Sequence, residues 1–143
     1  MIEMLGMLGL LGIAFATALP TINPARIQIT KAQRVLIANL RLARSSAITK
    51  NVHYAVTFPS STNLKLQRMK LQNGVWIVDT TQVQTISLPS GTKVPSSLVG
   101  SSVEYGTRGQ AVNLTAVKQI DITDTFGATK STQAWPSGQV NEL

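Results

Sequence analysis

Residues 4–25 form an apolar segment without a charged side chain, and this segment limits the possible folds more than any other feature. As an α-helix it would extend about 33 Å, at about 1.5 Å per residue, which matches the hydrocarbon thickness of a bilayer. Glu3 immediately precedes it. Because a carboxylate in hydrocarbon is costly unless it is paired, we expect Glu3 to pair with the N-terminal amine of a neighbouring chain.

The same segment contains residues that control how helices pack and bend. Gly6, Gly9 and Gly12 recur at every third position, close to one face, and would allow a second helix to approach closely. Pro20 is expected to kink or locally unwind the helix, because its ring removes a backbone donor and clashes with the preceding turn. Pro24 follows, so residues 21–25 are expected to be the least regular part of the rod.

A second helical pattern, amphipathic and basic, covers residues 26–51. Its apolar stripe consists of Ile29, Leu36, Leu40, Ala43 and Ala47. The bases that lie mostly off this stripe are Arg34, Arg41, Arg44 and Lys50. No acidic residue occurs between Glu3 and Asp79. The basic face could therefore bind anionic lipid, nucleic acid or acidic patches on neighbouring subunits, or it could be an ordinary solvated face.

Residues 52–143 are predicted to form a β-rich head. The strongest turn is Asn73-Gly74 between two apolar runs, because a type I′ hairpin needs positive φ at both central positions. Before it, Leu64, Leu66, Met69 and Leu71 alternate with one slip. Further strand candidates are 54–58, 83–88, 92–94, 102–105, 112–114, 118–123 and 132–135. The predicted class is α+β, with one long helix, apolar then amphipathic, packed against an antiparallel head.

The sequence offers few groups for chemistry. It has no cysteine, which excludes disulfides, thiolate catalysis and cysteine-ligated metals. No nucleophile elbow, phosphate loop or paired-carboxylate cleft can be assembled, so we expect no enzyme and no cofactor. His53 has no histidine or cysteine at metal spacing, and is interpreted as structural. Asp121 and Asp124 are candidates for a calcium site, although a strand end and turn explain them better.

Two simpler explanations for the apolar segment fit less well. A cleaved signal peptide would need basic residues at its start, where this chain has Glu3 instead. A plain single-pass anchor would place the bases after the span on the cytoplasmic side, whereas a charge-poor β-rich head is typical of the outside.

The first 20 residues, MIEMLGMLGLLGIAFATALP, resemble the N-terminus of type IV pilins in length, in the early acid and in the closing Leu-Pro. In that family a prepilin peptidase cuts after a glycine, the new N-terminus is methylated, and the acid stands at the fifth mature position. Because the acid here is the third residue, the resemblance implies two mature residues before Met1. It also implies that Glu3 sets the axial register of subunits in a filament.

The resemblance extends to residues 40–51, LRLARSSAITKN, which look like the helix end of the H-type minor pseudopilins of type II secretion and the related FimT-type pilins. Residues 88–94 and 135–138 look like the mid-head and C-terminal turns of that family. The resemblance implies a head of two small antiparallel sheets against the helix. It also implies partners of the same kind, in a helical filament of this chain or other pilins.

The function expected from the resemblance is that of a structural subunit of a type IV pilus or type II secretion pseudopilus. Such a subunit resides in the inner membrane before assembly and then in an extracellular or periplasmic filament. The alternative is a minor tip pilin that binds DNA for natural transformation or a secreted substrate. Some FimT-type pilins bind DNA through arginines near the C-terminus, but the corresponding tail here, residues 136–143, has Gln139 and no arginine.

Overall fold

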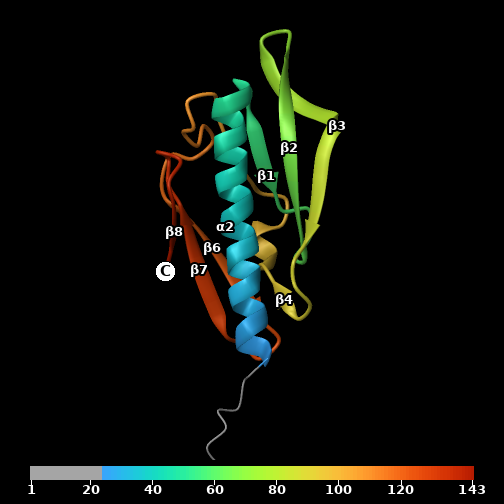
Figure 1. Cartoon of the computed structure of the whole chain (residues 1–143), viewed down its shortest axis with the longest axis vertical. Coiled ribbons are helices and arrows are strands. Elements are labelled where there is room, and N and C mark those ends of the chain that lie inside the picture. The colour runs from blue at the N-terminus through green and yellow to red at the C-terminus, as the bar shows by residue number, and fades with distance from the viewer. Residues whose placement is uncertain (1–23) are drawn as a thin grey trace, which may run out of the picture.

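The computed structural model describes residues 24–143, so the expectations for Glu3, Gly6, Gly9, Gly12 and Pro20 lie outside the described residues. Its long helix α2, Pro24–Lys50, runs along most of the head (Figure 1). Pro24 is the first helical residue, a position where its missing N–H removes no helical hydrogen bond. The helix ends where Asn51 adopts a left-handed φ of 51°. Within residues 24–143, no helix is both long and apolar enough to cross a membrane.

The first sheet has the strand order β3-β2-β1-β5, and every pair is antiparallel. Its strands are β1 Tyr54–Thr57, β2 Asn63–Gln72, β3 Val75–Ser87 and β5 Ser102–Tyr105. The predicted hairpin joins β2 to β3, with φ of 53° at Asn73 and 79° at Gly74. The register shifts between Gln67 and Met69. The extra residues of this irregularity, 79–82, lie in β3 opposite Arg68, next to the slip in the alternation of β2.

The second sheet has the order β4-β6-β7-β8 and is also antiparallel. Its strands are β4 Thr92–Lys93, β6 Lys118–Asp124, β7 Thr129–Ala134 and β8 Val140–Glu142. A short 3₁₀ helix, Ser96–Leu98, lies between β4 and β5. The chain therefore leaves the first sheet after β3, contributes β4 to the second sheet and then returns to the first sheet for β5.

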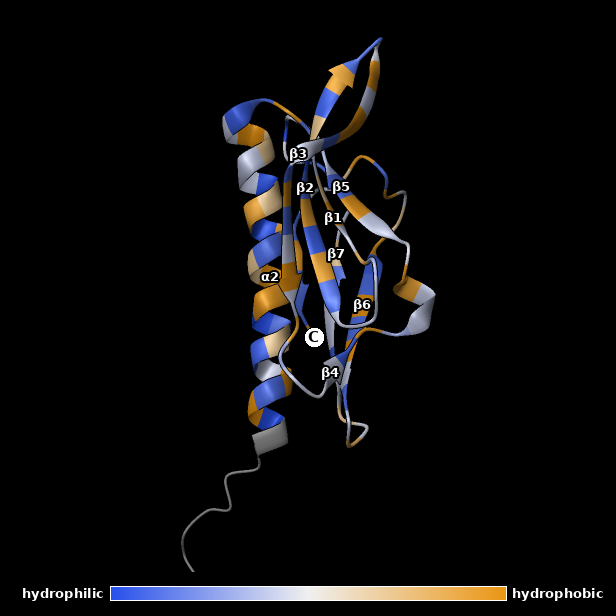
Figure 2. Ribbon diagram, turned by 90° about the vertical axis from the view of Figure 1, so that its right-hand side faces the viewer, coloured by the Kyte–Doolittle hydropathy of each residue, from blue (hydrophilic) through white to orange (hydrophobic). Residues whose placement is uncertain are grey.

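The core lies between α2 and the two sheets, and all five residues of the predicted helix stripe are buried in it. Leu36 and Leu40 are fully buried in the cluster that also contains Phe58 and Ile120. Hydrophobic positions alternate with hydrophilic ones along the strands (Figure 2). Gln33 is buried as well, and its Nε2 donates to the carbonyl of Ser131 on β7 at 2.8 Å. Polar and apolar contacts together hold the helix on both sheets.

The predicted α+β class, with two small antiparallel sheets against the amphipathic helix, is confirmed. Two strand predictions need correction, and one strand was not predicted. Residues 112–114 are not a strand, and only Ala111 forms a bridge, to Tyr105. The last predicted strand is shifted, because β7 covers 129–134 and leaves Trp135 outside. The short strand β8 was not predicted, because its three residues do not alternate.

Candidate functional site: the basic helix and the C-terminal strand

A groove of about 440 Å³ runs between the C-terminal half of α2 and the C-terminal segment of the chain. The helix contributes Arg41, Arg44, Ser45 and Ile48, and residues 138–141 form the other wall. Among residues 24–143, no carboxylate lines it. Two of the four predicted anionic-partner residues therefore meet at one place. The sequence predicted the two arginines but not the opposite wall, because β8 had no recognisable pattern.

Arg44 joins three segments that are distant in the sequence. Its side chain is partly buried, and its Nε donates to the carbonyl of Gly109 at 3.1 Å. Gly138, in the turn before β8, has a φ of 84°. A Cβ at Gly138 would lie 1.8 Å from the Gly109 oxygen and 3.0 Å from Arg44 Nε. The loop at Gly109 and the turn at Gly138 are thus packed backbone against backbone beside one guanidinium.

The other three predicted bases have different environments. Arg41 is exposed, and its Nη2 donates to the carbonyl of Val140 on β8 at 3.4 Å. Lys50 is exposed at the end of α2, and its Nζ donates to the Tyr54 hydroxyl at 3.1 Å. Arg34 is exposed on the first half of the helix. The four bases thus do not form one cluster, because only Arg41 and Arg44 share the groove.

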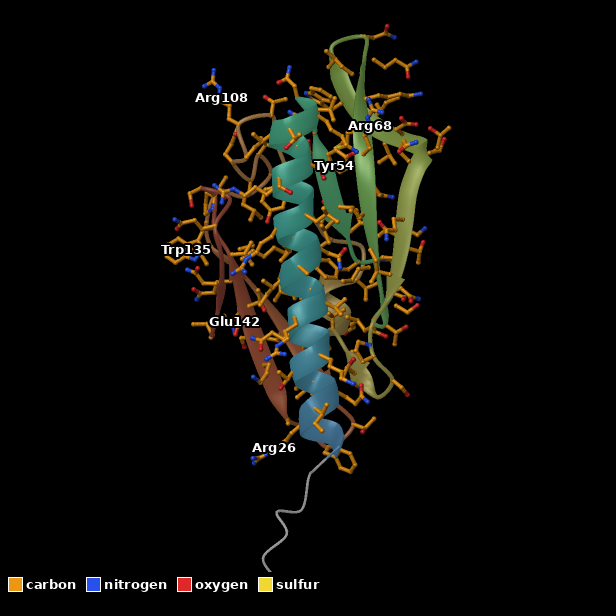
Figure 3. The ribbon with its side chains drawn as sticks, viewed as in Figure 1. Arg26, Tyr54, Arg68, Arg108, Trp135 and Glu142 are labelled. Atoms are coloured by element: carbon orange, nitrogen blue, oxygen red, sulfur yellow. The ribbon has the colours of Figure 1, made fainter. Side chains whose placement is uncertain are left out.

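The charge of the site follows from the sequence of α2, in which every charged side chain is basic. Trp135 and Glu142 lie on the side of the helix where the second sheet lies, whereas Tyr54 and Arg68 lie on the side of the first sheet (Figure 3). Glu142 is exposed on β8 and is the acid nearest in sequence to the groove wall. The site can therefore attract an anionic group, but it has no acid–base pair for catalysis.

His53 has a structural environment at the start of the first sheet. Its Nδ1 lies 2.6 Å from Glu104 Oε1 on β5, within hydrogen-bonding distance. Its ring stacks on Trp76, with centroids 4.0 Å apart and an interplanar angle of 11°. These contacts tie the end of α2 to β5 and β3.

Asp121 and Asp124 do not converge on one site. They are three positions apart on β6, so the alternation of the strand puts them on opposite faces. Asp121 Oδ1 accepts from Gln119 and Ser131, and Asp124 Oδ1 accepts from the backbone N–H groups of Phe126 and Ala128. Among residues 24–143, no group of three His, Cys, Asp or Glu side chains could hold a metal ion. The Asp121 carboxylate therefore accepts hydrogen bonds within the sheet, and the Asp124 carboxylate accepts hydrogen bonds from the turn that follows β6.

Comparison with known proteins finds similarity to solved structures. No protein-family model and no curated protein sequence matches the chain. The solved structures that resemble it include the type IV minor pilin FimU of Pseudomonas aeruginosa in two crystal forms. One aligns with a TM-score of 0.61 at 14% identity and covers 80% of this chain and 91% of that one. The other gives a TM-score of 0.63 at 16% identity, with coverage of 82% and 90%.

The minor pseudopilin EpsH from the type 2 secretion system of Vibrio cholerae also resembles the chain. Its TM-score is 0.56 at 12% identity, and the alignment covers 81% of this chain and 96% of that one. The alignments with both proteins thus cover at least 80% of this chain. The chain therefore has the type IV pilin-like fold found in minor pilins and minor pseudopilins.

Proposed function

We propose that the chain is a structural subunit of a type IV pilus or of a type II secretion pseudopilus, assembled into a helical filament through its N-terminal helix. The observation that carries the proposal is the fold, one long helix covered by two antiparallel sheets, which resembles a minor pilin and a minor pseudopilin. The apolar segment that precedes this fold in the sequence supports it independently.

The packing of α2 supports different roles for the two halves of the N-terminal helix, filament core for the first and attachment of the head for the second. Its apolar stripe is buried by the head, and the remaining surface of α2 is mainly polar and basic with isolated exposed apolar residues, such as Leu42 at 46%. The head-covered half thus has little apolar surface left for a filament core. Residues 1–25 would form that core, and repeated heterologous contacts along one axis would extend the fibre.

The proposal also includes the location and processing of such a subunit before and after assembly. The chain would begin in the inner membrane, would be processed and methylated by a prepilin peptidase, and would end in an extracellular or periplasmic filament. The uncharged stretch of residues 4–25 supports the membrane stage, because its length matches a bilayer when helical.

The decisive experiment concerns Glu3. Glu3→Ala should abolish incorporation of the chain into filaments, counted by immunogold electron microscopy, while its membrane level stays unchanged. Glu142→Ala removes an exposed acid at the other end of the chain and is the matched control, with normal incorporation expected. Normal incorporation of Glu3→Ala would refute the register role of the acid.

A second candidate function is capture of an anionic partner, such as DNA or a secreted substrate, by a subunit at the filament tip. The groove beside Arg41 and Arg44 favours it, because no carboxylate of the described part of the chain lines this groove. In this case, replacing Arg41, Arg44 and Lys50 with glutamine should lower DNA retention and make it less dependent on salt. The slope of log affinity against log salt concentration should become shallower by about 0.9 for each phosphate that the variant no longer neutralises.

The matched control for that experiment lies on the same helix. Arg26, Lys31 and Arg34 are exposed on its first half, so their triple replacement removes the same charge away from the groove. Circular dichroism of both triple variants separates loss of binding from loss of fold, since Arg44 also holds the Gly109 loop. Equal DNA retention by wild type and the groove variant would exclude this face as the receptor.

A further inference from the structure

The free edges of the two sheets are treated very differently in this head. Edge strands expose unpaired backbone N–H and C=O groups, which can pair with another chain unless they are shortened, charged or covered. The first sheet ends in β3 and β5, and the second ends in β4 and β8. Within residues 24–143, three of these four edges are blunted and one is not.

The edge of β5 is capped by two side chains and by one backbone N–H group. Asn113 acts like a short strand, because its Oδ1 accepts from the Glu104 N–H at 2.9 Å and its Nδ2 donates to the Ser102 carbonyl at 3.0 Å. Lys118 Nζ donates to the same Ser102 carbonyl at 3.3 Å. The Val112 N–H donates to the Glu104 carbonyl at 2.8 Å. All of these bonds use backbone groups that would otherwise accept a new strand.

The two edges of the second sheet are blunted in other ways. β4 consists of only two residues, Thr92–Lys93, which is too short to act as a template. On β8, the Val140 carbonyl accepts from Arg41 Nη2. Neither edge offers a long row of free backbone groups.

The edge formed by β3 is interrupted by the register shift at residues 79–82, but within residues 24–143 its segment 83–87 is regularly paired with β2 and has none of these protections. β3 is 13 residues long and is an edge strand of the first sheet, on the side away from β6, β7 and β8 (Figure 1). Its residues 80–87, TTQVQTIS, contain no charged residue and no proline. Most of these residues are exposed. A long, uncharged, exposed edge of this kind is a template for strand pairing.

The register identifies which backbone groups are free. The Leu88 N–H donates to the Thr62 carbonyl at 2.8 Å, so the backbone groups of Leu88 point toward the β2 side. Ile86 and Gln84 lie two and four positions before Leu88 and pair with β2, so their backbone groups point the same way. In an antiparallel ladder the intervening residues point the other way. Val83, Thr85 and Ser87 therefore direct their N–H and C=O groups outward. No backbone partner within residues 24–143 occupies them.

A hollow beside this edge fits the side chains of an added strand. It has a volume of about 330 Å³ and lies between α2 and residues 81–84 of β3. Its walls include Leu42, Tyr54 and Leu66, and Lys50 is the one charged residue that residues 24–143 contribute to it. The charge around it is one-sided, because Asp79 is the only acid between Arg26 and Leu88, a stretch with bases on both α2 and β2. This environment repels a second basic strand and attracts an acidic one.

We propose that the free edge of β3 binds an extended segment of another polypeptide by strand addition, and that this segment alternates acidic and apolar side chains. The acidic side chains would point toward the hollow and Lys50, and the apolar ones would alternate with them on the opposite face of the sheet. Backbone hydrogen bonds to Val83, Thr85 and Ser87 would supply the part of the affinity that does not depend on the sequence of the added strand. A second copy of this chain does not fit this chemistry, because its own edge carries no acid over residues 80–87.

The test uses the full chain in detergent and an eight-residue peptide of alternating valine and glutamate. Amide exchange should slow at Val83, Thr85 and Ser87 on adding this peptide. Thr85→Pro removes one outward N–H and should weaken peptide binding about tenfold or more, whereas Thr85→Val keeps that N–H and should bind like wild type. Lys50→Gln should weaken binding a few-fold, about threefold, and reduce its salt dependence, while Lys93→Gln on the remote β4 should not.

Several results would overturn the proposal. One is the absence of protection at these three amides at the highest soluble peptide concentration. Another is equal binding by the Thr85→Pro variant, whose fold is checked by circular dichroism. A peptide with lysine in place of glutamate that binds equally well would refute the acidic chemistry. Protection of the same amides by duplex DNA alone, or by self-association without peptide, would assign the edge to a different partner.

Discussion

Replacing Gly138 with alanine perturbs the place where the C-terminal turn, the Gly109 loop and the helix meet. Gly138 has a φ of 84°, a conformation that costs an alanine about 1 to 2 kcal/mol. Its new Cβ would lie 1.8 Å from the Gly109 carbonyl oxygen. Because that neighbour is backbone and cannot rotate away, the turn and the loop must separate.

The size of the effect follows from the hydrogen bond that this separation breaks. The Gly109 carbonyl accepts from Arg44 Nε at 3.1 Å, and such charge-assisted bonds contribute about 1.5 to 3 kcal/mol. Together with the backbone conformation, Gly138→Ala should destabilise the head by about 3 to 5 kcal/mol. Gly127→Ala is the matched control, because Gly127 has a φ of 83° with nothing within 4 Å of a Cβ. It should cost only about 1 to 2 kcal/mol.

Urea unfolding of the full chain in detergent, followed by circular dichroism, measures both free energies of unfolding. The difference between the two variants isolates the close approach, since the left-handed conformation is common to both. A difference of about 2 kcal/mol or more is expected. If Gly138→Ala costs no more than Gly127→Ala, the turn and the loop are not packed as described, and the groove beside Arg44 loses its defined wall.

Three further predictions concern the core and the β5 edge. Burial raises the pKa of Tyr105 to about 12. Because the Tyr105 hydroxyl loses its proton at lower pH in the unfolded chain than in the folded one, the free energy of unfolding is highest below pH 10. It should fall by about 2 to 3 kcal/mol as the pH rises to 12. Urea unfolding measures this loss, and the variant Tyr105→Phe should not show it. Leu40→Ala should cost about 3 kcal/mol, because Leu40 is fully buried, whereas Leu42→Ala, at 46% exposure, should cost less than about 1 kcal/mol by the same measurement. Asn113→Ala should speed amide exchange at Glu104, since it removes the side-chain acceptor of that N–H; unchanged exchange would contradict the capping role.

The parts of the fold that depend on local rules could be predicted from the sequence. The helix stripe of Leu36 and Leu40 repeats with the period of an α-helix, and each position is buried. The hairpin at Asn73 and Gly74 needs positive φ at both residues, and both have it. The slip before it lies next to the register shift between β2 and β3. In each case residues that are close in sequence determine the structure.

The parts that depend on distant residues could not be predicted. Residues 112–114 have strand-like composition, but the Asn113 side chain pairs with β5 in place of a strand. β8 is ordered by pairing with β7 and not by its own three residues. At the candidate site, Arg41 and Arg44 were recognisable as bases, but nothing near them in sequence indicated that Arg44 would bind the Gly109 carbonyl.

The return of the chain to the first sheet after β4 has a consequence for proteolysis. β4 belongs to the second sheet but comes from the N-terminal side of the loop at residues 106–117, whereas β6, β7 and β8 come from its C-terminal side. A single cut in this loop would leave two fragments joined by strand pairing and by the shared core under α2. Neither fragment contains a complete pair of sheets, so a nicked subunit should stay associated until the whole head unfolds.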